Sequence, residues 1–316
     1  MYRIGVDLGG TNIAVGVLDE NRKIVGRGNL KTKLPRPAEE IFDDIAEACR
    51  IAVKNAGITM GDVQSIGIGA PGTINKDTGI IEFSNNFRFF NVPAREMLVE
   101  RLGEMPIYLD NDANAAALGE AIVGAGHGVS SFIAITLGTG VGSGIVIDGK
   151  VLTGINFAGG EMGHMVIHTD GPQCNCGRRG CWECYSSATA LIAQTKDAMK
   201  HHHDSLMWEL CDNSIFNVSG RTAFDAMEKG DAAAKEVVDN YIYYLAMGLT
   251  NVVNIFQPEI VCIGGGICNQ GESLLAPLRK MVERERYSIH AKRQTKIVVA
   301  ELGNDAGIYG AALLDC

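Results

Sequence analysis

The sequence predicts an α/β protein made of two similar halves that face each other across a cleft. Apolar, strand-like runs alternate with amphipathic helical segments along the 316 residues. In addition, the order strand, glycine loop, strand, acidic turn, short strand occurs twice, starting with IGVDLGGT at 4–11 and with IAITLGTG at 133–140. A supersecondary unit that recurs in this way is typical of a duplicated α/β architecture.

The first half is predicted to open with a three-stranded meander followed by a helix. The helix, at about 38–56, has apolar residues every three or four positions, acidic residues in its first turn and basic residues near its end, and Gly57 stops it. This charge order complements the helix dipole. The predicted strands of this half are 2–8, 12–18, 23–28, 63–69 and 106–110.

The second half is predicted to contain more helix. An alanine-rich helix at 113–122 follows the last strand of the first half, and a variable stretch at 201–217 interrupts the helical region. The other predicted elements are helices at about 186–200, 222–228, 231–256 and 272–286 and a strand at 259–263.

Composition excludes several classes of function. The net charge is −9, from 37 acidic and 28 basic residues, and no lysine or arginine run is long enough to bind nucleic acid. No apolar run is long enough to span a membrane, and the N-terminal residues lack the apolar core of a signal peptide. We therefore expect a cytoplasmic protein. Five cysteines are scattered singly, as reduced thiols usually are: Cys49, Cys211, Cys262, Cys268 and Cys316.

Two glycine loops predict a phosphate-binding clamp, because glycine lets phosphate oxygens approach backbone N–H groups. The first is Asp7 to Asn12, in which Asp7 is placed to hold Mg²⁺, and the second is 138–144. A third loop, at 264–266, suits either the close approach of an adenosine or an ordinary strand-to-helix turn. The candidate cofactor-binding residues are Asp7, Gly9, Gly10, Thr11, Asn12, Gly138, Thr139, Gly140, Gly142, Gly264, Gly265 and Gly266.

A polar segment, LDNDAN at 109–114, ends a strand and opens a helix. A carboxylate at this position faces the expected cleft beside the positive end of the helix. Asp112 is the candidate general base because it lies at the helix start. The alternative interpretation makes Asp110 or Asp112 a simple helix cap.

Four metal-ligand side chains fall within eighteen residues, at His164, Cys174, Cys176 and Cys181. Gly177 and Gly180 allow the tight turn that brings the thiolates together. One histidine and three cysteines form a donor set that structural Zn²⁺ prefers. Cys184 adjoins this cluster but breaks its spacing, so we leave it out of the ligand set.

Together, the segments DLGGTN, LDNDANAAALGE, GTGVGSG, GEMGH and CNCGRRGCWE resemble the ROK family of bacterial sugar kinases and repressors, from residue 4 to about residue 310. The resemblance implies a two-domain actin/hexokinase-like ATPase (ribonuclease H-like) fold with an interdomain cleft and a structural zinc loop. The expected domains are residues 1–112 plus about 305–316, and residues 113–304. The segment at 303–312 resembles the helix that crosses back to the first domain.

The resemblance also implies residue roles and cofactors. Asp112 would take the proton from the 6-hydroxyl of a hexose, ATP and Mg²⁺ would bind the glycine loops, and Zn²⁺ would be structural. The sugar-binding residues would be Asn86, Asn111, Asp112, Glu161, His164 and Glu183, although the region after Asn86 departs from the family's tryptophan-bearing pattern.

Glucose is the expected substrate, with N-acetylmannosamine, N-acetylglucosamine and fructose as alternatives. The sequence does not distinguish ATP from polyphosphate as the donor. The resemblance implies a homo-oligomer, a dimer or tetramer, without fixing which. A sugar-responsive repressor of the same family is disfavoured, because Asp7 comes too early to leave room for a DNA-reading helix.

Overall fold

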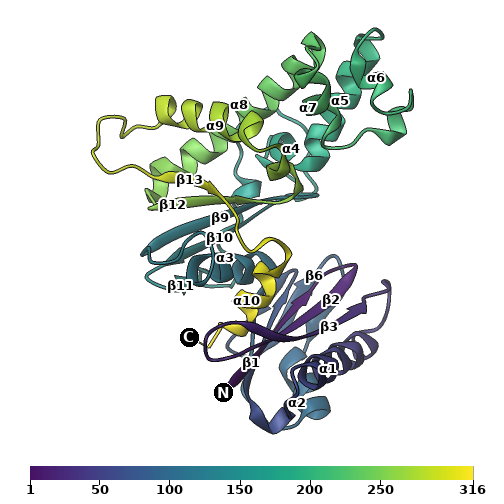
Figure 1. Ribbon diagram of the computed structural model, residues 1–316, viewed down its shortest axis with the longest axis vertical. Coiled ribbons are helices and arrows are strands. Elements are labelled where there is room, and N and C mark those ends of the chain that lie inside the picture. Colours follow the sequence, from purple (N-terminus) through teal and green to yellow (C-terminus); the bar gives the residue numbers. More distant parts are fainter. Residues whose placement is uncertain (316) are drawn as a thin grey trace. The chain divides into compact units, whose positions relative to one another are not determined.

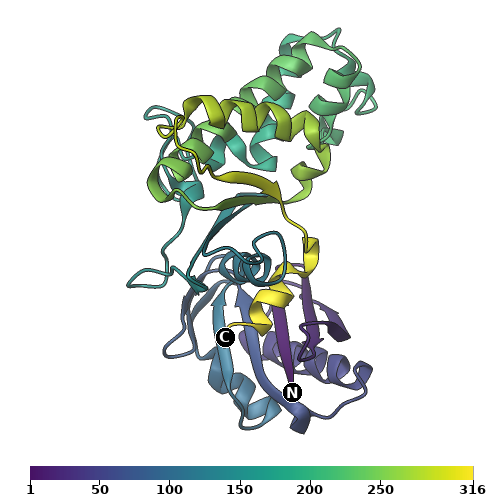
Figure 2. The same cartoon turned by 60° about the vertical axis from the view of Figure 1, so that its left-hand side comes forward.

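The computed structural model describes residues 1–315 and places them in two compact units (Figures 1 and 2). Cys316, one of the cysteines predicted to be reduced, lies outside the described residues. Unit 1 comprises Met1–Ala134, Gly144–Gly160 and the C-terminal segment from Ala300. Unit 2 comprises Ile135–Ser143 and Glu161–Val299. The domain boundaries expected from the sequence stay a prediction.

Unit 1 is built on a five-stranded sheet with the order β3-β2-β1-β4-β8. The strands are β1 (Tyr2–Leu8), β2 (Asn12–Leu18), β3 (Ile24–Lys31), β4 (Val63–Ala70) and β8 (Ile107–Asn111). The three strands β1, β4 and β8 are parallel, whereas β2 and β3 continue the sheet as an antiparallel meander. All five strands were predicted. Because the carboxyl ends of parallel strands meet at one edge, the polar residues that follow β1 and β8 come together there.

Helices cover both faces of this sheet. Helix α1 (Ala38–Asn55) packs on β3 and β2 through Gly26 and Gly28, where an added Cβ would lie only 2.3 and 2.1 Å from carbonyl oxygens of α1. Helix α2 (Ala94–Leu102) packs against α1 and β8. The other face carries α3 (Asp112–Ile122) and α10 (Ala306–Ala312), which also pack on each other.

A row of glycines lets α10 lie directly on the sheet. Gly16, Gly5 and Gly67 are register partners across β2, β1 and β4. A Cβ at Gly5 would lie 1.9 Å from the carbonyl oxygen of Ile308, and one at Gly67 would lie 1.7 Å from that of Ala311. Figure 2 shows the resulting arrangement, with the yellow helix α10 against the purple strand β1. At Gly5 and Gly67, no residue other than glycine fits without moving the helix, whereas a Cβ at Gly16 would meet the side chain of Ile308 at 2.6 Å.

We expect Gly67→Ala to destabilise the protein by about 3 kcal/mol, because its methyl group would collide with backbone and not with a side chain that can turn away. Urea unfolding followed by circular dichroism measures this loss. Gly61→Ala is the matched control, since Gly61 is exposed and a Cβ there would be 3.6 Å from its nearest neighbour. Equal midpoints for the two variants would contradict the proposed close packing.

Unit 1 also contains a small antiparallel sheet that was not predicted. Its strands are β5 (Thr73–Asn75), β6 (Ile80–Ser84) and β7 (Phe89–Val92), in the order β5-β6-β7. These strands have three to five residues and are separated by polar turns, so no periodic signal develops. Helix α2 was missed as well, because its apolar positions form only a weak stripe.

The second five-stranded sheet has the order β11-β10-β9-β12-β13. Its strands are β9 (Ser131–Leu137), β10 (Val141–Ile147), β11 (Lys150–Val151), β12 (Ile260–Gly264) and β13 (Lys296–Val299). The last of these, β13, was not predicted.

The helices of unit 2 pack around α8 (Ala232–Phe256), which contacts α5 (Ala188–His201), α7 (Thr222–Glu228) and α9 (Glu272–Glu285). The four helices α5, α7, α8 and α9 confirm the predicted ones.

Among residues 1–315, no helix is both long and apolar enough to cross a membrane. The remaining short helices are α4 (Glu183–Ser186), α6 (Leu206–Glu209), η1 (Met60–Asp62), η2 (Met162–His164), η3 (Ile215–Asn217), η4 (Gly266–Gln270) and η5 (Gly303–Asp305).

Candidate functional site

Three carboxylates gather at the carboxyl edge of the unit 1 sheet. Asp7 on β1 and Asp110 on β8 are both register partners of Gly69 on β4, so they flank that glycine on one face of the sheet. A Cβ at Gly69 would lie 2.9 Å from the Ala115 Cβ and 3.5 Å from the Asp112 Cα. The first turn of α3 therefore rests over Gly69 and carries Asp112 to the same place.

The start of α3 is held by the two residues before Asp112. Asn111 is the N-cap, and its Oδ1 accepts hydrogen bonds from the backbone N–H groups of Ala113 (2.9 Å) and Asn114 (3.3 Å). Its Nδ2 donates to the carbonyl oxygen of Gly72 at 3.1 Å. Because both lone pairs of Oδ1 are used, Asn111 can offer a sugar only its second N–H.

Asp110 is a buried anchor for this helix. Its Oδ1 accepts hydrogen bonds from Asn111 N (2.7 Å) and from the buried Asn114 Nδ2 (2.8 Å). Asp112 Oδ1 accepts one from Ala113 N at 2.9 Å, and no side chain of the described residues hydrogen-bonds to Asp112. The cap is thus Asn111 and neither aspartate, which leaves the Asp112 side chain for another role.

Burial dominates the electrostatics of the three acids. It raises the pKa of Asp7 to about 6, with a further contribution from the negative charge of Asp112. Burial also raises the pKa values of Asp110 and Asp112, against hydrogen bonds that lower them. Crowded and partly desolvated carboxylates of this kind favour a bound cation, and the oxygen donors suit Mg²⁺.

The raised pKa of Asp7 makes a prediction about stability. The folded protein binds this proton more tightly than the unfolded chain between pH 3.8 and about 6, so the free energy of unfolding falls as pH rises through that window. Without ligands, Asp7→Asn should therefore stabilise the protein by about 2 kcal/mol at pH 7.5 and by much less at pH 4.5. Urea unfolding at both pH values measures this, with the exposed Asp77→Asn as the control. A destabilised Asp7→Asn variant at pH 7.5 would contradict the assignment.

The first glycine loop lies beside these acids. Gly9 N donates to the carbonyl oxygen of Asn12 at 2.9 Å, which closes the turn between β1 and β2. Gly10, Thr11 and Asn12 are exposed. Asn86, predicted to bind the sugar, is exposed in the loop between β6 and β7.

The second glycine loop, in unit 2, is supported by Glu183. Val141 N donates to Glu183 Oε2 at 2.9 Å, and a Cβ at Gly140 would lie 2.1 Å from that oxygen. Gly138 and Thr139 at the tip of the loop are exposed. Glu183, predicted as a sugar ligand, thus also shapes the glycine loop, a role that its position in the sequence does not reveal.

Glu161 is the N-cap of the short helix η2 and His164 is its last residue, and η2 packs on the start of β10. A Cβ at Gly163 would lie 2.1 Å from the carbonyl oxygen of Val141, and Met162 N donates to Ser143 Oγ at 3.0 Å. Glu161 is exposed and His164 is half-buried. Unit 2 therefore brings Glu161, His164 and Glu183 to one end of β10.

The third glycine loop has a structural explanation. Gly265 has a φ of +102°, and a Cβ there would lie 2.2 Å from the carbonyl oxygen of Leu137 at the end of β9. Close packing of backbone on backbone requires this glycine. Gly264 ends β12, and a Cβ at Gly266 would meet no atom within 4 Å.

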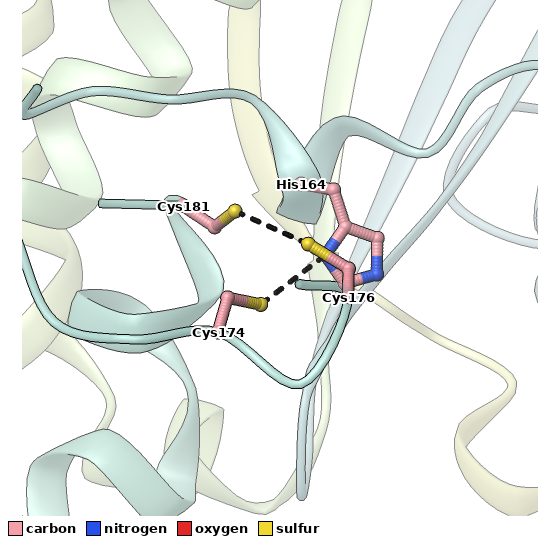
Figure 3. Close-up of side chains that lie close together, drawn as sticks. All are labelled: His164, Cys174, Cys176 and Cys181. Carbon is pink, nitrogen blue, oxygen red and sulfur yellow. Dashed lines mark hydrogen bonds between the residues drawn. The ribbon is translucent and has the colours of Figure 1, made fainter. Parts of the chain in front are cut away.

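The four predicted metal ligands converge in the loop that precedes α4 (Figure 3). One ligand atom from each of His164, Cys174, Cys176 and Cys181 lies within 4.8 Å of all the others. The Cys174 Sγ to His164 Nδ1 distance and the Cys176 Sγ to Cys181 Sγ distance are both 3.6 Å. Ligands about 2.0–2.3 Å from a tetrahedral Zn²⁺ stand roughly 3.3–3.8 Å apart, so the donor set fits this ion.

Local backbone and packing hold this cysteine loop, residues 174–181. Gly180 has a φ of +72°, and a Cβ there would lie 1.6 Å from the carbonyl oxygen of His168. Trp182, fully buried, lies over Gly248 and donates its indole N–H to the carbonyl oxygen of Tyr244 at 3.1 Å. Cys184 is half-buried and outside the group of four, as predicted.

Comparison with known proteins identifies the family. The model of the ROK family matches residues 3–315. Over its length the chain is 40% identical to a glucokinase of Thermotoga maritima, covering 98% of this chain and 95% of that relative. It is 37% identical to a glucokinase of Halalkalibacterium halodurans, covering 99% of this chain and 94% of that relative.

A solved structure is similar as well. The ROK family glucokinase from Streptomyces griseus, in complex with glucose and AMPPNP, is 35% identical and superimposes with a TM-score of 0.82 over 99% of both chains. The chain belongs to the ROK family, and both the resemblance and the α/β fold class expected from the sequence are confirmed.

Proposed function

We propose that this protein is a glucokinase that transfers the γ-phosphoryl group of ATP to the 6-hydroxyl of glucose. The observation that carries the proposal is the position of Asp112, a half-buried carboxylate on the first turn of α3 beside Asp7 and without a side-chain partner among the described residues. Two relatives at 37–40% identity are glucokinases, which supports the same substrate.

In this proposal Asp112 accepts the proton of the sugar hydroxyl as the new P–O bond forms. In phosphoryl transfer the protein contributes little covalent chemistry. Alignment of the two substrates and stabilisation of the charge on the phosphates therefore provide most of the rate enhancement. Asp112 therefore needs only an ionised carboxylate at neutral pH. Asn111 would orient the sugar with its second amide N–H, and Asn86 would add a further contact from its exposed loop.

Unit 2 would supply the other sugar contacts, from Glu161, His164 and Glu183. His164 serves the metal site in this proposal, so its second ring nitrogen is the one left for the sugar. Glu183 has a similar double task, because one of its oxygens holds the 138–142 loop. A single glutamate that supports both sugar and phosphate loop would couple the binding of the two substrates.

The chemistry of the side-chain and backbone groups indicates which cofactors the protein would bind. ATP would bind through the backbone N–H groups of the loops at 9–12 and 138–142, and Mg²⁺, held by Asp7, would neutralise charge on the phosphates. Zn²⁺ held by His164 and the three cysteines would stiffen the loop that leads to Glu183 and would take no part in the transfer itself. The homo-oligomeric state and the cytoplasmic location stay predictions.

A coupled assay of ADP release tests the proposal. The panel contains glucose, fructose, N-acetylglucosamine and N-acetylmannosamine, each with ATP and with polyphosphate as donor. We expect the highest kcat/KM for glucose with ATP. One or two buried hydrogen bonds of about 1–3 kcal/mol each are enough to set such a preference between sugars. An N-acetyl sugar ranking first would correct the substrate, and no turnover with any hexose would refute the kinase.

A further inference from the structure

One lysine is fastened to the first glycine loop. Lys31, the last residue of β3, is the register partner of Asn12 on β2, and its Nζ donates to Asn12 Oδ1 at 2.8 Å. Paired residues in a sheet point to the same face, so the Lys31 side chain shares the face of Asn12. Lys31 is exposed and forms no ion pair with any carboxylate of residues 1–315.

The neighbouring residue holds this arrangement in place. Thr32 is fully buried, and its Oγ1 donates to the carbonyl oxygen of Gly9 at 2.7 Å. Its backbone N–H donates to the carbonyl oxygen of Thr11 at 3.0 Å. With the Lys31 bond, three hydrogen bonds tie the end of β3 to residues 9–12. The position of the ammonium group is therefore fixed by the same contacts that shape the loop.

The nearest comparable cation on this strand is already neutralised. Arg27 lies four residues earlier on the same face of β3, and its two terminal nitrogens bind both oxygens of Asp305 at 2.7 Å. The loop itself, from Gly9 to Asn12, contains no basic residue, and the acids Asp7 and Asp112 lie close by. A polyphosphate at this loop would meet negative charge on one side and would need a positive side chain on the other.

We propose that Lys31 is a phosphate-binding cation that leaves Asn12 to contact the β- or γ-phosphate of ATP. An ammonium on a flexible stem can follow a phosphate oxygen as negative charge moves during transfer. Asn12 would hold the ammonium in position before the nucleotide arrives. This inference rests on the proposed function, because it names the residue that meets the phosphates of the same nucleotide.

The test measures nucleotide binding and turnover separately. Isothermal titration with AMPPNP and with AMP is run on the wild-type protein, Lys31→Met, Lys31→Arg and Lys23→Met. Lys23 is exposed and precedes the start of β3, roughly 25 Å of strand away from Lys31, so it controls for loss of one charge. The ADP-release assay with glucose is run on the same four proteins.

We expect Lys31→Met to bind AMPPNP roughly tenfold more weakly and AMP with unchanged affinity, because AMP lacks the outer phosphates. The KM for ATP should rise while the KM for glucose stays within twofold, and Lys31→Arg should recover most of the loss. A general structural defect would change AMP binding and glucose KM as well.

Equal AMPPNP affinity in Lys31→Met and Lys23→Met would overturn the inference. A parallel loss of affinity for AMP and AMPPNP would overturn it too. If the wild type binds AMPPNP but releases no ADP with any hexose, the proposed kinase function fails, whereas a selective loss of AMPPNP binding in Lys31→Met would still support the phosphate contact.

Discussion

Asp112→Asn is expected to lower kcat for glucose phosphorylation by about 10²- to 10⁴-fold, the usual contribution of a positioned general base. An amide cannot accept the hydroxyl proton, yet it has the size of the carboxylate and can still accept the hydrogen bond from Ala113 N. The KM for glucose should change little, since the substituted group acts mainly in the transition state. Steady-state kinetics by ADP release provides the measurement.

A measurement of stability distinguishes a catalytic defect of Asp112→Asn from misfolding of the variant. Burial raises the pKa of Asp112, which means that the ionised carboxylate destabilises the folded state. Replacing it with asparagine should therefore not lower the free energy of unfolding. Asp77→Asn, on the exposed turn between β5 and β6, is the charge-matched control and should retain full activity. If Asp112→Asn keeps a kcat within threefold of the wild type, another group accepts the proton.

Removal of the metal site is expected to have the largest effect on stability. Cys181→Ser should abolish the binding of one Zn²⁺ per chain, because Cys181 is fully buried and belongs to the group of four ligands. Zinc binding to small modules contributes on the order of 10 kcal/mol, and a large part of that would be lost from the segment around the site. Elemental analysis and thermal unfolding measure both effects.

The adjacent thiol offers a matched control for the metal prediction. Cys184→Ser changes a cysteine three residues further along that lies outside the group of four, so it should keep one Zn²⁺ and nearly the wild-type melting temperature. A chelator should convert the wild type to the behaviour of Cys181→Ser. Full activity and an unchanged melting temperature in metal-free wild-type protein would refute the structural role of the metal.

Most of the fold could be predicted because its signals are local. The parallel strands are continuous apolar runs, and α1 carries both an apolar stripe and charges that complement its dipole. The glycine row beneath α10 could not be predicted, because Gly5, Gly16 and Gly67 are brought together only by strand pairing. The small sheet of β5, β6 and β7 was missed for a related reason, since its strands are too short to show a period.

The candidate site likewise contains features that are local in the sequence and features that are not. The four metal ligands lie close in sequence and are close in space, so their spacing was informative. The division of labour around Asp112 depends on hydrogen bonds that a sequence does not display: Asn111 caps α3, and Asp110 binds Asn114. The bond between Glu183 and Val141 N joins residues far apart in the chain, and no local pattern announces it.

The packing of α10 on the unit 1 sheet has a consequence for how the chain folds during synthesis. The strands of the sheet that receives this helix end at Asn111 and are therefore synthesised well before Ala306–Ala312. Until α10 has been synthesised, the face around Gly5 and Gly67 has no cover, although the opposite face can already dock α1. During that interval, one side of the sheet is open to chaperones and proteases.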